Sequence, residues 1–174
     1  LDGSGVMIKA LSGGGGRGMR AVTDPAALEA AFQRCQSEAK AAFGNDAVYV
    51  EQLVTAARHI EVQVLGDGSG AVSHLWERDC TLQRRHQKLV EFAPAPGLDV
   101  ALRDRIIDSA LTLAAEVNYL GIGTFEFLVE PDAGRHFFME ANPRVQVEHT
   151  VSEQVTGVDL VQTQIHLAAG ASLA

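Results

Sequence analysis

The amino-acid sequence predicts an α+β fold in which a mixed or antiparallel sheet is flanked by helices. The sheet is predicted because the apolar, alternating segments 59–65 and 123–129 are each followed, across a short turn, by another strand-like segment. Strands joined in this way pair as antiparallel hairpins. In addition, the helical segments stand apart from these hairpins instead of alternating with single strands, which favours α+β over α/β.

The first third of the chain contains a strand, a glycine run, two further strands and a helix. Short strands are predicted at 6–10, 19–22 and 48–54. The run from Ser12 to Gly18 lies between the first two strands, and we interpret it as the tip of a hairpin lid. A helix is predicted between them and the third strand, with Asp24 as N-cap, Pro25 in the first helical position and Gly44 at its end.

The remainder of the chain begins with a hairpin and a polar segment. The glycine-rich turn 66–70 connects segment 59–65 to a strand at 71–76. The polar segment 77–88 has no clear periodicity, and we interpret it as a loop. Two further helices are predicted, one over 99–117 with Asp99 as N-cap and one over 158–169 with Gly170 at its end.

Length and composition limit the class of protein. The chain has 174 residues, enough for one domain or two small lobes, and 47% of them are hydrophobic, so a packed core is expected. The net charge of −8 argues against a nucleic-acid partner, and no apolar run approaches the roughly 20 residues of a membrane span. Because the chain starts at Leu1 without a signal peptide, we expect a piece of a longer protein. Cys35 and Cys80 lack metal-ligand spacing and suit free thiols in a reducing compartment.

Acidic and amide side chains line one face of the second hairpin. By strand alternation, Phe138, Glu140 and Asn142 point to the same face. Glu126 points away from its phenylalanine neighbours, and hairpin pairing brings it close to Glu140. Carboxylate and amide oxygens suit magnesium bound together with phosphate oxygens, so we predict a metal site at Glu126, Glu140 and Asn142. The alternatives are a solvated strand face or an ion pair with Arg144.

The glycine run is a candidate phosphate loop. Four consecutive glycines, Gly13 to Gly16, allow backbone N–H groups to approach an anion closely. Lys9, at the end of the preceding strand, adds a positive charge. Because a strand and not a helix follows the run, a dinucleotide-binding motif is excluded. The alternative is a flexible surface linker.

A second anion site is indicated by basic residues that gather in one polar segment of this acidic protein: Arg78, Arg84, Arg85 and Lys88. The alternative is a solvated charged loop. His59 and His86 lack metal-ligand spacing, and we interpret them as hydrogen-bonding partners. If strand alternation continues past Pro143, the polar row of the preceding strand is extended by Arg144, Gln146 and Glu148.

Several short motifs occur in one order along the chain. They are Lys9 with the glycine run, Arg58 to Val64, Glu77 to Cys80, Gln83 to Lys88, Glu91 to Pro96, Gly123 to Phe127, and Glu140 to His149. Together they closely resemble the ATP-grasp core of biotin carboxylases, the component of acetyl-CoA, acyl-CoA and pyruvate carboxylases that carboxylates biotin. The resemblance implies a partial, glycine-rich ATP-grasp lid over residues 1–54 and a core with the metal and bicarbonate sites over residues 55–174.

The resemblance also implies a role for each matching position. ATP would be held by Lys9, Gly13, Gly14, Gly15, Gly16, Glu51, His59, Gln83 and His86. Magnesium or manganese would be bound by Glu126, Glu140 and Asn142. Bicarbonate would be bound by Lys88, Arg144, Gln146, Val147 and Glu148. Among these, Glu148 would be the base that activates bicarbonate, Arg144 would stabilise the biotin enolate, and Lys88 would complete the catalytic set.

The implied activity is that of an ATP-dependent ligase. Bicarbonate would attack the γ-phosphate of ATP to give carboxyphosphate, which breaks down to carbon dioxide, and N1 of carrier-bound biotin would capture it. The implied partners are a biotin carboxyl carrier and a carboxyltransferase, as subunits or domains of a homo-oligomeric enzyme. Neither nucleic acid nor a membrane is implied as a partner. The expected compartment is the bacterial cytoplasm or the mitochondrial matrix.

Two other functions stay open. One is another ATP-grasp ligase, such as a carboxylate–amine or carboxylate–thiol ligase or a carbamoyl-phosphate-type enzyme, and the row Arg144, Gln146 and Glu148 argues against it. The other is a non-catalytic nucleotide-binding fragment, and the presence of the whole predicted catalytic set argues against that. Because residues 1–174 contain neither a complete lid nor a biotin-contacting domain, we expect the isolated chain to bind ATP weakly and not to carboxylate free biotin measurably.

Overall fold

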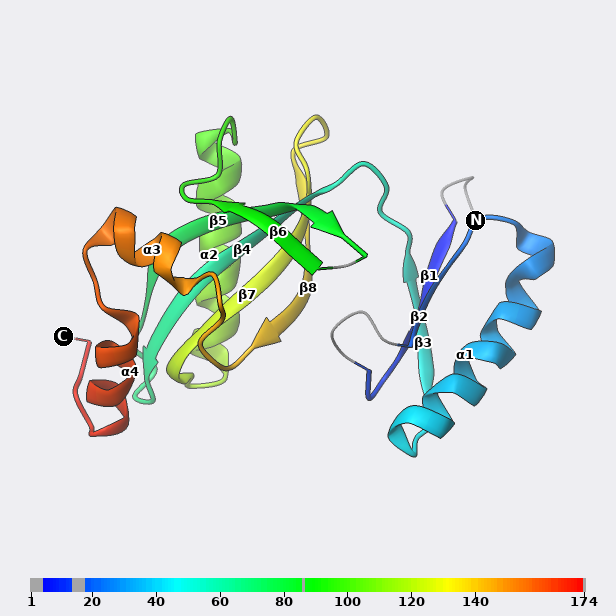
Figure 1. Cartoon of the computed structure of the whole chain (residues 1–174), viewed down its shortest axis with the longest axis horizontal. Coiled ribbons are helices and arrows are strands. Elements are labelled where there is room, and N and C mark those ends of the chain that lie inside the picture. The colour runs from blue at the N-terminus through cyan, green and yellow to red at the C-terminus, as the bar shows by residue number, and fades with distance from the viewer. Residues whose placement is uncertain (1–4, 14–17, 86, 174) are drawn as a thin grey trace. The chain divides into compact units, whose positions relative to one another are not determined.

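The computed structural model describes residues 5–13, 18–85 and 87–173. The chain forms two compact units, with the boundary between Ala56 and Ala57, and Figure 1 shows the elements of each. No helix among the described residues is long and apolar enough to cross a membrane.

The first unit is a three-stranded antiparallel sheet with one helix on it. The strands are β1 (Val6–Ala10), β2 (Met19–Val22) and β3 (Val48–Gln52), in the order β2-β1-β3. The predicted hairpin on either side of the glycine run is confirmed by the pairing of β1 with β2. The predicted helix is also confirmed, as a first turn of 3-10 helix, η1 (Pro25–Ala27), followed by α1 (Leu28–Phe43). Its Asp24 cap accepts a hydrogen bond from Ala26 N.

The second unit is a five-stranded antiparallel sheet with helices on both faces. The strands are β4 (Arg58–Asp67), β5 (Val72–Arg84), β6 (Gln87–Phe92), β7 (Leu120–Glu130) and β8 (Arg135–Asn142), in the order β6-β5-β4-β7-β8. Helix α2 (Val100–Glu116) crosses behind these strands in Figure 1. The main core lies under α2 and includes Ile60, Val62, Ile106, Ala110 and Phe127.

The opposite face of the sheet changes from apolar to polar along β4. At one end, Leu65 packs with Leu160 and Leu167 of α4 (Leu160–Ala168). Towards the other end, the same face presents polar side chains from β4, and α3 (His149–Thr156) lies over this region. The predicted last helix is confirmed as α4, although it begins at Leu160 with Asp159 as N-cap, and α3 was not predicted.

The prediction of a loop over 77–88 is wrong. Residues Val72–Arg84 form β5, and β6 begins at Gln87, so most of this polar segment lies in a hairpin at the edge of the sheet. Its buried polar residues form ion pairs and hydrogen bonds: Glu77, Arg78 and Asp79. A search for alternating hydrophobicity misses such a strand, because the inward-facing residues are charged.

Strand β8 does not alternate regularly, so the predicted common face of Phe138 and Glu140 is also wrong. Glu140 pairs with Glu126, whereas Phe138 pairs with Phe127, and the register shifts between these pairs. Met139 is therefore an extra residue in a β-bulge. Because cross-strand partners share a face, Glu140 points to the face of Glu126, and Phe138 points to the α2 face.

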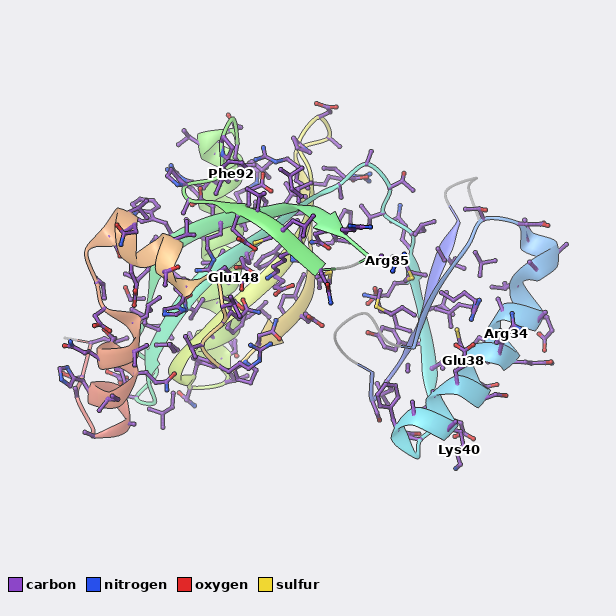
Figure 2. The ribbon with its side chains drawn as sticks, in the orientation of Figure 1. Arg34, Glu38, Lys40, Arg85, Phe92 and Glu148 are labelled. Carbon is purple, nitrogen blue, oxygen red and sulfur yellow. The ribbon has the colours of Figure 1, made fainter. Side chains whose placement is uncertain are left out.

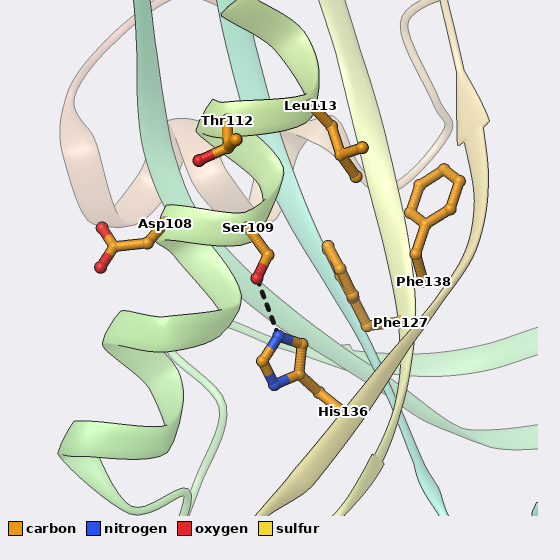
Figure 3. A pocket seen from close by; sticks show the side chains of 7 residues that line it. All are labelled: Asp108, Ser109, Thr112, Leu113, Phe127, His136 and Phe138. Carbon is orange, nitrogen blue, oxygen red and sulfur yellow. Dashed lines mark hydrogen bonds between the residues drawn. The ribbon is translucent and has the colours of Figure 1, made fainter. Parts of the chain in front are cut away.

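Phe138 lines an open cavity of about 410 Å³ between α2 and the last two strands (Figure 3). The other lining residues are Asp108, Ser109, Thr112, Leu113, Phe127 and His136. Ser109 Oγ donates to the carbonyl of Arg105 and therefore accepts its 2.8 Å hydrogen bond from His136 Nε2. In this arrangement Ser109 is not an activated nucleophile, and the cavity lies on the face of the sheet away from Glu126.

The core under α2 predicts the effect of a substitution. Replacing Ile106, which is fully buried, by alanine removes three methyl or methylene groups and leaves a cavity, which we expect to lower the free energy of unfolding by about 3 kcal/mol. Urea denaturation of the chain measures this change. The control is Leu113→Ala on the same helix, which is partly exposed and should cost no more than about 1 kcal/mol. Equal losses in the two variants would contradict this assignment of the core.

Candidate active site

A buried cluster of charges lies on the face of the sheet opposite α2. Lys88 Nζ, from β6, lies 2.5 Å from Glu148 Oε1 and 3.1 Å from Glu126 Oε1, and it also contacts Glu61 Oε2. Each carboxylate comes from a different part of the fold: Glu61 from β4 and Glu126 from β7. Glu148, which is labelled in Figure 2, immediately precedes α3. The fold thus brings one cation into contact with three carboxylates.

Arg78 is the second cation of the cluster. Its Nε donates to Glu61 Oε1 at 2.6 Å, and its Nη1 donates to Gln63 Oε1 at 2.9 Å and to Ser152 Oγ at 2.7 Å. The Arg78 and Glu61 side chains are fully buried. Removing two such charges from water is unfavourable unless they are paired and hydrogen-bonded, so the network explains how these polar residues occupy the middle of a sheet.

His59 connects Glu126 to Gln83. Gln83 Nε2 lies 2.7 Å from His59 Nδ1 and donates to the carbonyl of Cys80, so both protons of the amide are used if Nδ1 is an acceptor. His59 then carries its proton on Nε2 and donates it to Glu126 Oε2 at 2.8 Å. The structure therefore brings together two of the predicted ATP-binding residues, and it agrees with the interpretation of His59 as a hydrogen-bonding partner.

Two amides complete the surroundings of Glu126. Its Oε1 accepts from Asn142 Nδ2 at 2.9 Å and from Gln146 Nε2 at 3.3 Å. Gln146 is buried and in turn accepts from the Thr124 hydroxyl at 2.8 Å. Glu126 therefore lies at the centre of the predicted metal and bicarbonate residues. Its ionic partner is Lys88, and not Arg144, which the sequence offered as the alternative partner.

The charges in the cluster stabilise one another. Burial disfavours ionisation of Glu126, but the hydrogen bond from His59 and the positive charge of Lys88 outweigh it and lower the pKa of Glu126 to about 2. Burial is likewise outweighed at Glu148, whose pKa is lowered by the hydrogen bond from Lys88. Burial opposes the charge on Lys88, yet Glu61 and Glu126 raise its pKa above the usual value. At neutral pH, Glu148 is a carboxylate that can accept a proton, and Lys88 is a permanent cation.

The predicted metal residues share one face of the β7–β8 hairpin. Glu126 and Glu140 are direct cross-strand partners, and Asn142 is close enough to hydrogen-bond to Glu126. In the part of the chain that the structure describes, no hydrogen bond or ion pair reaches the Glu140 carboxylate. Since Asn142 uses its amide N–H toward Glu126, its Oδ1 is available as a ligand. Two carboxylates and an amide oxygen form a donor set that suits magnesium.

Two predicted bicarbonate residues lie outside the hydrogen-bonded cluster. Arg144 is exposed, and its Nη1 donates only to the neighbouring carbonyl of Val145, at 3.2 Å, among the contacts described. The Val147 side chain is 92% exposed, so any contact with an anion would use its backbone. Strand β8 ends at Asn142, just before Pro143, so regular pairing stops there and Arg144 does not extend the row of the strand.

The predicted ATP residues of the first unit are only partly described. Lys9 Nζ forms a 2.5 Å ion pair with Glu51 Oε2 across the β1–β3 pair, which brings these two predicted residues together. Gly13 N donates to the carbonyl of Ala10 in a turn after β1. The remaining predicted positions, Gly14, Gly15, Gly16 and His86, lie outside the described residues.

Several cluster residues were not assigned a role from the sequence. They are Glu61, Gln63, Cys80 and Thr124, while Arg78 was predicted only as part of an anion site and instead pairs with Glu61. A signal was present for the first two, because they share the alternating face of β4 with His59. Cys80 Sγ lies within 4.8 Å of carboxylate oxygens of Glu61 and Glu148. Burial and the Glu61 charge raise the pKa of its thiol, which therefore stays protonated, and both cysteines are free as predicted.

Comparison with known proteins places the chain in a family. A family model described as carbamoyl-phosphate synthase L chain, ATP binding domain, matches residues 3–174. The chain belongs to this family. Members of the family among curated proteins include pyruvate carboxylase of Bacillus subtilis, 57% identical over 97% of the chain, and that of Staphylococcus aureus, 56% identical over 97%. The chain spans 14% of the length of each of these relatives.

Solved structures of this ATP-binding family agree with the fold. Biotin carboxylase from Campylobacter jejuni, described in complex with β-γ-ATP, is 48% identical with a TM-score of 0.93 over 99% of this chain and 39% of that one. The biotin carboxylase domain of 2-oxoglutarate carboxylase from Hydrogenobacter thermophilus is 44% identical with a TM-score of 0.89, over 97% of this chain and 37% of that one. The predicted resemblance to the biotin carboxylase core and the predicted α+β, ATP-grasp fold are therefore confirmed.

The lowered pKa of Glu126 predicts a pH dependence of stability. The pKa falls from an ordinary 4.5 to about 2 on folding, so the stabilisation is complete well above pH 4.5 and is lost as the pH falls toward 2. Between pH 6 and pH 3 this group alone should lower the free energy of unfolding by about 2 kcal/mol. Urea denaturation at both pH values should show a smaller loss for Glu126→Gln than for the unmodified chain.

The control for this measurement is Glu38→Gln, because Glu38 is an exposed carboxylate paired with Arg20 in the first unit. Its pH dependence should match that of the unmodified chain. The same pH dependence in Glu126→Gln would show that Glu126 is not the buried, ion-paired carboxylate described above.

Proposed function

We propose that this chain is the ATP-grasp core of a biotin-dependent carboxylase, in which ATP and magnesium drive the carboxylation of biotin by bicarbonate. The observation that carries the proposal is the Lys88–Glu148 pair, a permanent cation and an ionised carboxylate 2.5 Å apart in a largely buried cluster. Beside this pair lies an oxygen donor set suited to magnesium. The biotin carboxylase domain from H. thermophilus was solved with MgADP and bicarbonate, which supports a magnesium nucleotide and bicarbonate as the ligands of this site.

Bicarbonate is a small anion with one proton to lose before it can attack phosphorus. Lys88 supplies the positive charge that holds the anion. Arg144 is exposed and, among the described residues, hydrogen-bonded only to the neighbouring carbonyl of Val145, so it can move onto the anion. Glu148 accepts the bicarbonate proton. The oxygen then attacks the γ-phosphorus of ATP, and ADP leaves, which gives carboxyphosphate.

The Glu148 carboxylate becomes a stronger base as bicarbonate binds. With no substrate, the hydrogen bond from Lys88 lowers its pKa. An anion that shares the Lys88 ammonium weakens this hydrogen bond and adds a like charge, and both effects raise the pKa of a carboxylate. Carboxyphosphate then breaks down to carbon dioxide and phosphate. The released phosphate takes the N1 proton of biotin, Arg144 stabilises the resulting enolate form, and N1 then captures the carbon dioxide.

Glu126, Glu140 and Asn142 would hold magnesium, which neutralises charge on the phosphates and orients them. Hydrogen bonds from the two strands that flank β7 hold Glu126 in place: Asn142 of β8 and His59 of β4 both bond to its carboxylate. In the first unit, Lys9 would contact the phosphates after exchanging its partner Glu51 for the nucleotide, and Glu51 would then face the adenine.

The acceptor that receives the carboxyl group from biotin is pyruvate in this proposal. The curated relatives that match at 52–57% identity are pyruvate carboxylases, which favours pyruvate over an acyl-CoA. The chain would work with a biotin carboxyl carrier and a carboxyltransferase domain in a homo-oligomer, in the bacterial cytoplasm or the mitochondrial matrix. The experiment is fixation of labelled bicarbonate on biotin by the full-length enzyme, with ATP and magnesium, beside the isolated chain.

A second candidate is a carbamoyl-phosphate-type enzyme, which the description of the matching family model favours. Such an enzyme would begin with the same attack of bicarbonate on ATP, and it would then use an amine in place of biotin. ATP cleavage that depends on ammonia or glutamine, and not on biotin, would select this function.

Glu148 tests the proposed base. Glu148→Gln keeps the size of the side chain and a hydrogen-bond acceptor for Lys88 but removes the proton acceptor, so the full-length enzyme should lose roughly 100-fold or more in kcat. Labelled bicarbonate fixation measures this loss, and Glu116→Gln at the exposed end of α2 is the control. Retained kcat in Glu148→Gln would rule out Glu148 as the base.

Glu140 tests the proposed metal site. Because no described residue pairs with its carboxylate, Glu140→Gln should change the free energy of unfolding by less than about 1 kcal/mol. The same substitution should lower turnover about 100-fold and raise the magnesium concentration needed for half-maximal rate. Glu130→Gln, at the other end of the same hairpin, is the matched control. An unchanged magnesium dependence would contradict the assignment of Glu140.

A further inference from the structure

Arg78 is a large, fully buried charged side chain to which the proposed reaction gives no task. It is the bulkiest of the described side chains that are completely buried. One of its nitrogens, Nη2, has no hydrogen-bond partner among the described residues. Buried ion pairs are often replaceable by apolar residues without loss of stability, and an unpartnered buried donor is unfavourable. Stability alone is therefore a poor explanation for an arginine at this position.

The contacts of Arg78 extend to two separate elements. On one side, Nε donates to Glu61 Oε1, and the other oxygen of the same carboxylate contacts Lys88. On the other side, Nη1 donates to Ser152 Oγ in α3 at 2.7 Å. Ser152 lies one helical turn after Glu148, the N-cap of α3. Arg78 is thus connected to Lys88 through a carboxylate and to Glu148 through a helix.

Both members of the Lys88–Glu148 pair therefore have their positions tied to one rigid group. The guanidinium is planar and presents its donors in a fixed fork. Lys88 lies on an edge strand and Glu148 follows the irregular segment after β8, so neither is fixed by regular pairing on both sides. We propose that Arg78 is a positioning residue that sets the separation and orientation of Lys88 and Glu148, and with them the grip on bicarbonate. This inference rests on the function proposed above.

The chain contains a matched pair that shows what a structural role alone would do. Arg58 and Asp79 also form an ion pair between β4 and β5, with N and O 2.5 Å apart and both side chains largely buried. Asp79 is the neighbour of Arg78 in β5, so its side chain points to the other face of the sheet. Arg58 makes no contact with the charged cluster among those described, which makes it the control.

The experiment compares four variants of the full-length enzyme: Arg78→Met, Arg78→Lys, Ser152→Ala and Arg58→Met. Bicarbonate-dependent ATP cleavage and biotin carboxylation are measured while bicarbonate and ATP are varied separately. Loss of positioning should lower kcat/KM for bicarbonate by about 100-fold in Arg78→Met, with the KM for ATP unchanged. The lysine of Arg78→Lys can reach either Glu61 or Ser152 but not both, so its kcat/KM for bicarbonate should be about tenfold higher than that of Arg78→Met.

Ser152→Ala removes only the link to α3 and leaves both charges of the Arg78–Glu61 pair. It should raise the KM for bicarbonate by about three- to tenfold. If Arg78→Met does not fold, this variant tests whether Arg78 positions Lys88 and Glu148. If the role of Arg78 is purely structural, its variants should contain less folded, active enzyme but should keep the KM for bicarbonate. This is the result expected for the control Arg58→Met.

The two proposals fail in different ways. If the unmodified enzyme is active and Ser152→Ala and Arg78→Lys keep its KM for bicarbonate, Arg78 is not a positioning residue and the proposed function stands. If the unmodified full-length enzyme cleaves ATP without any dependence on bicarbonate or biotin, the proposed function fails, and the role of Arg78 fails with it.

Discussion

The arrangement of the second unit depends on the placement of the Lys88 ammonium among Glu61, Glu126 and Glu148. Three carboxylates this close together, two of them almost completely buried, would repel one another and draw protons if the cation were absent. With the cation present, Glu126 and Glu148 stay ionised in a region where burial favours the neutral form. This requirement explains why four separate elements converge on one point and why polar residues replace apolar ones on this half of the sheet.

The two faces of the sheet therefore carry out different tasks. The face under α2 is apolar and supplies the packing that holds the strands together. The opposite face is apolar where α4 covers it, at Leu65 and Ile122, and becomes charged toward His59. A continuous core on one face stabilises the sheet enough for the other face to hold buried charges, which contribute little net stability themselves. The chemistry of the site is in this way supported by strands whose stability comes from elsewhere.

Local patterns in the sequence were sufficient for much of the fold. Asp24, Gly44 and Asp99 act as predicted at helix ends, because capping depends on neighbouring residues alone. The polar half of β5 was not recognised, because Glu77 and Arg78 are buried by partners distant in sequence, and hydrophobic alternation contains no trace of them. In the site, Glu126, Glu140 and Asn142 could be grouped from hairpin pairing. Arg78 could not, since Arg78, Glu61 and Ser152 lie on three different elements that only the folded structure brings together.

The extra residue in β8 has a consequence for how this strand can change in evolution. Met139 resets the alternation, so that Phe138 before it faces the helix while Glu140 after it faces the charges. If the same sequence formed a strand without the bulge, regular alternation would put Phe138 and Glu140 on one face, and would place either a carboxylate against the apolar core or a phenyl ring among the ion pairs. Deleting Met139 itself would restore regular pairing and leave both side chains on their present faces. The strand can therefore lose a residue at the bulge without exchanging its faces.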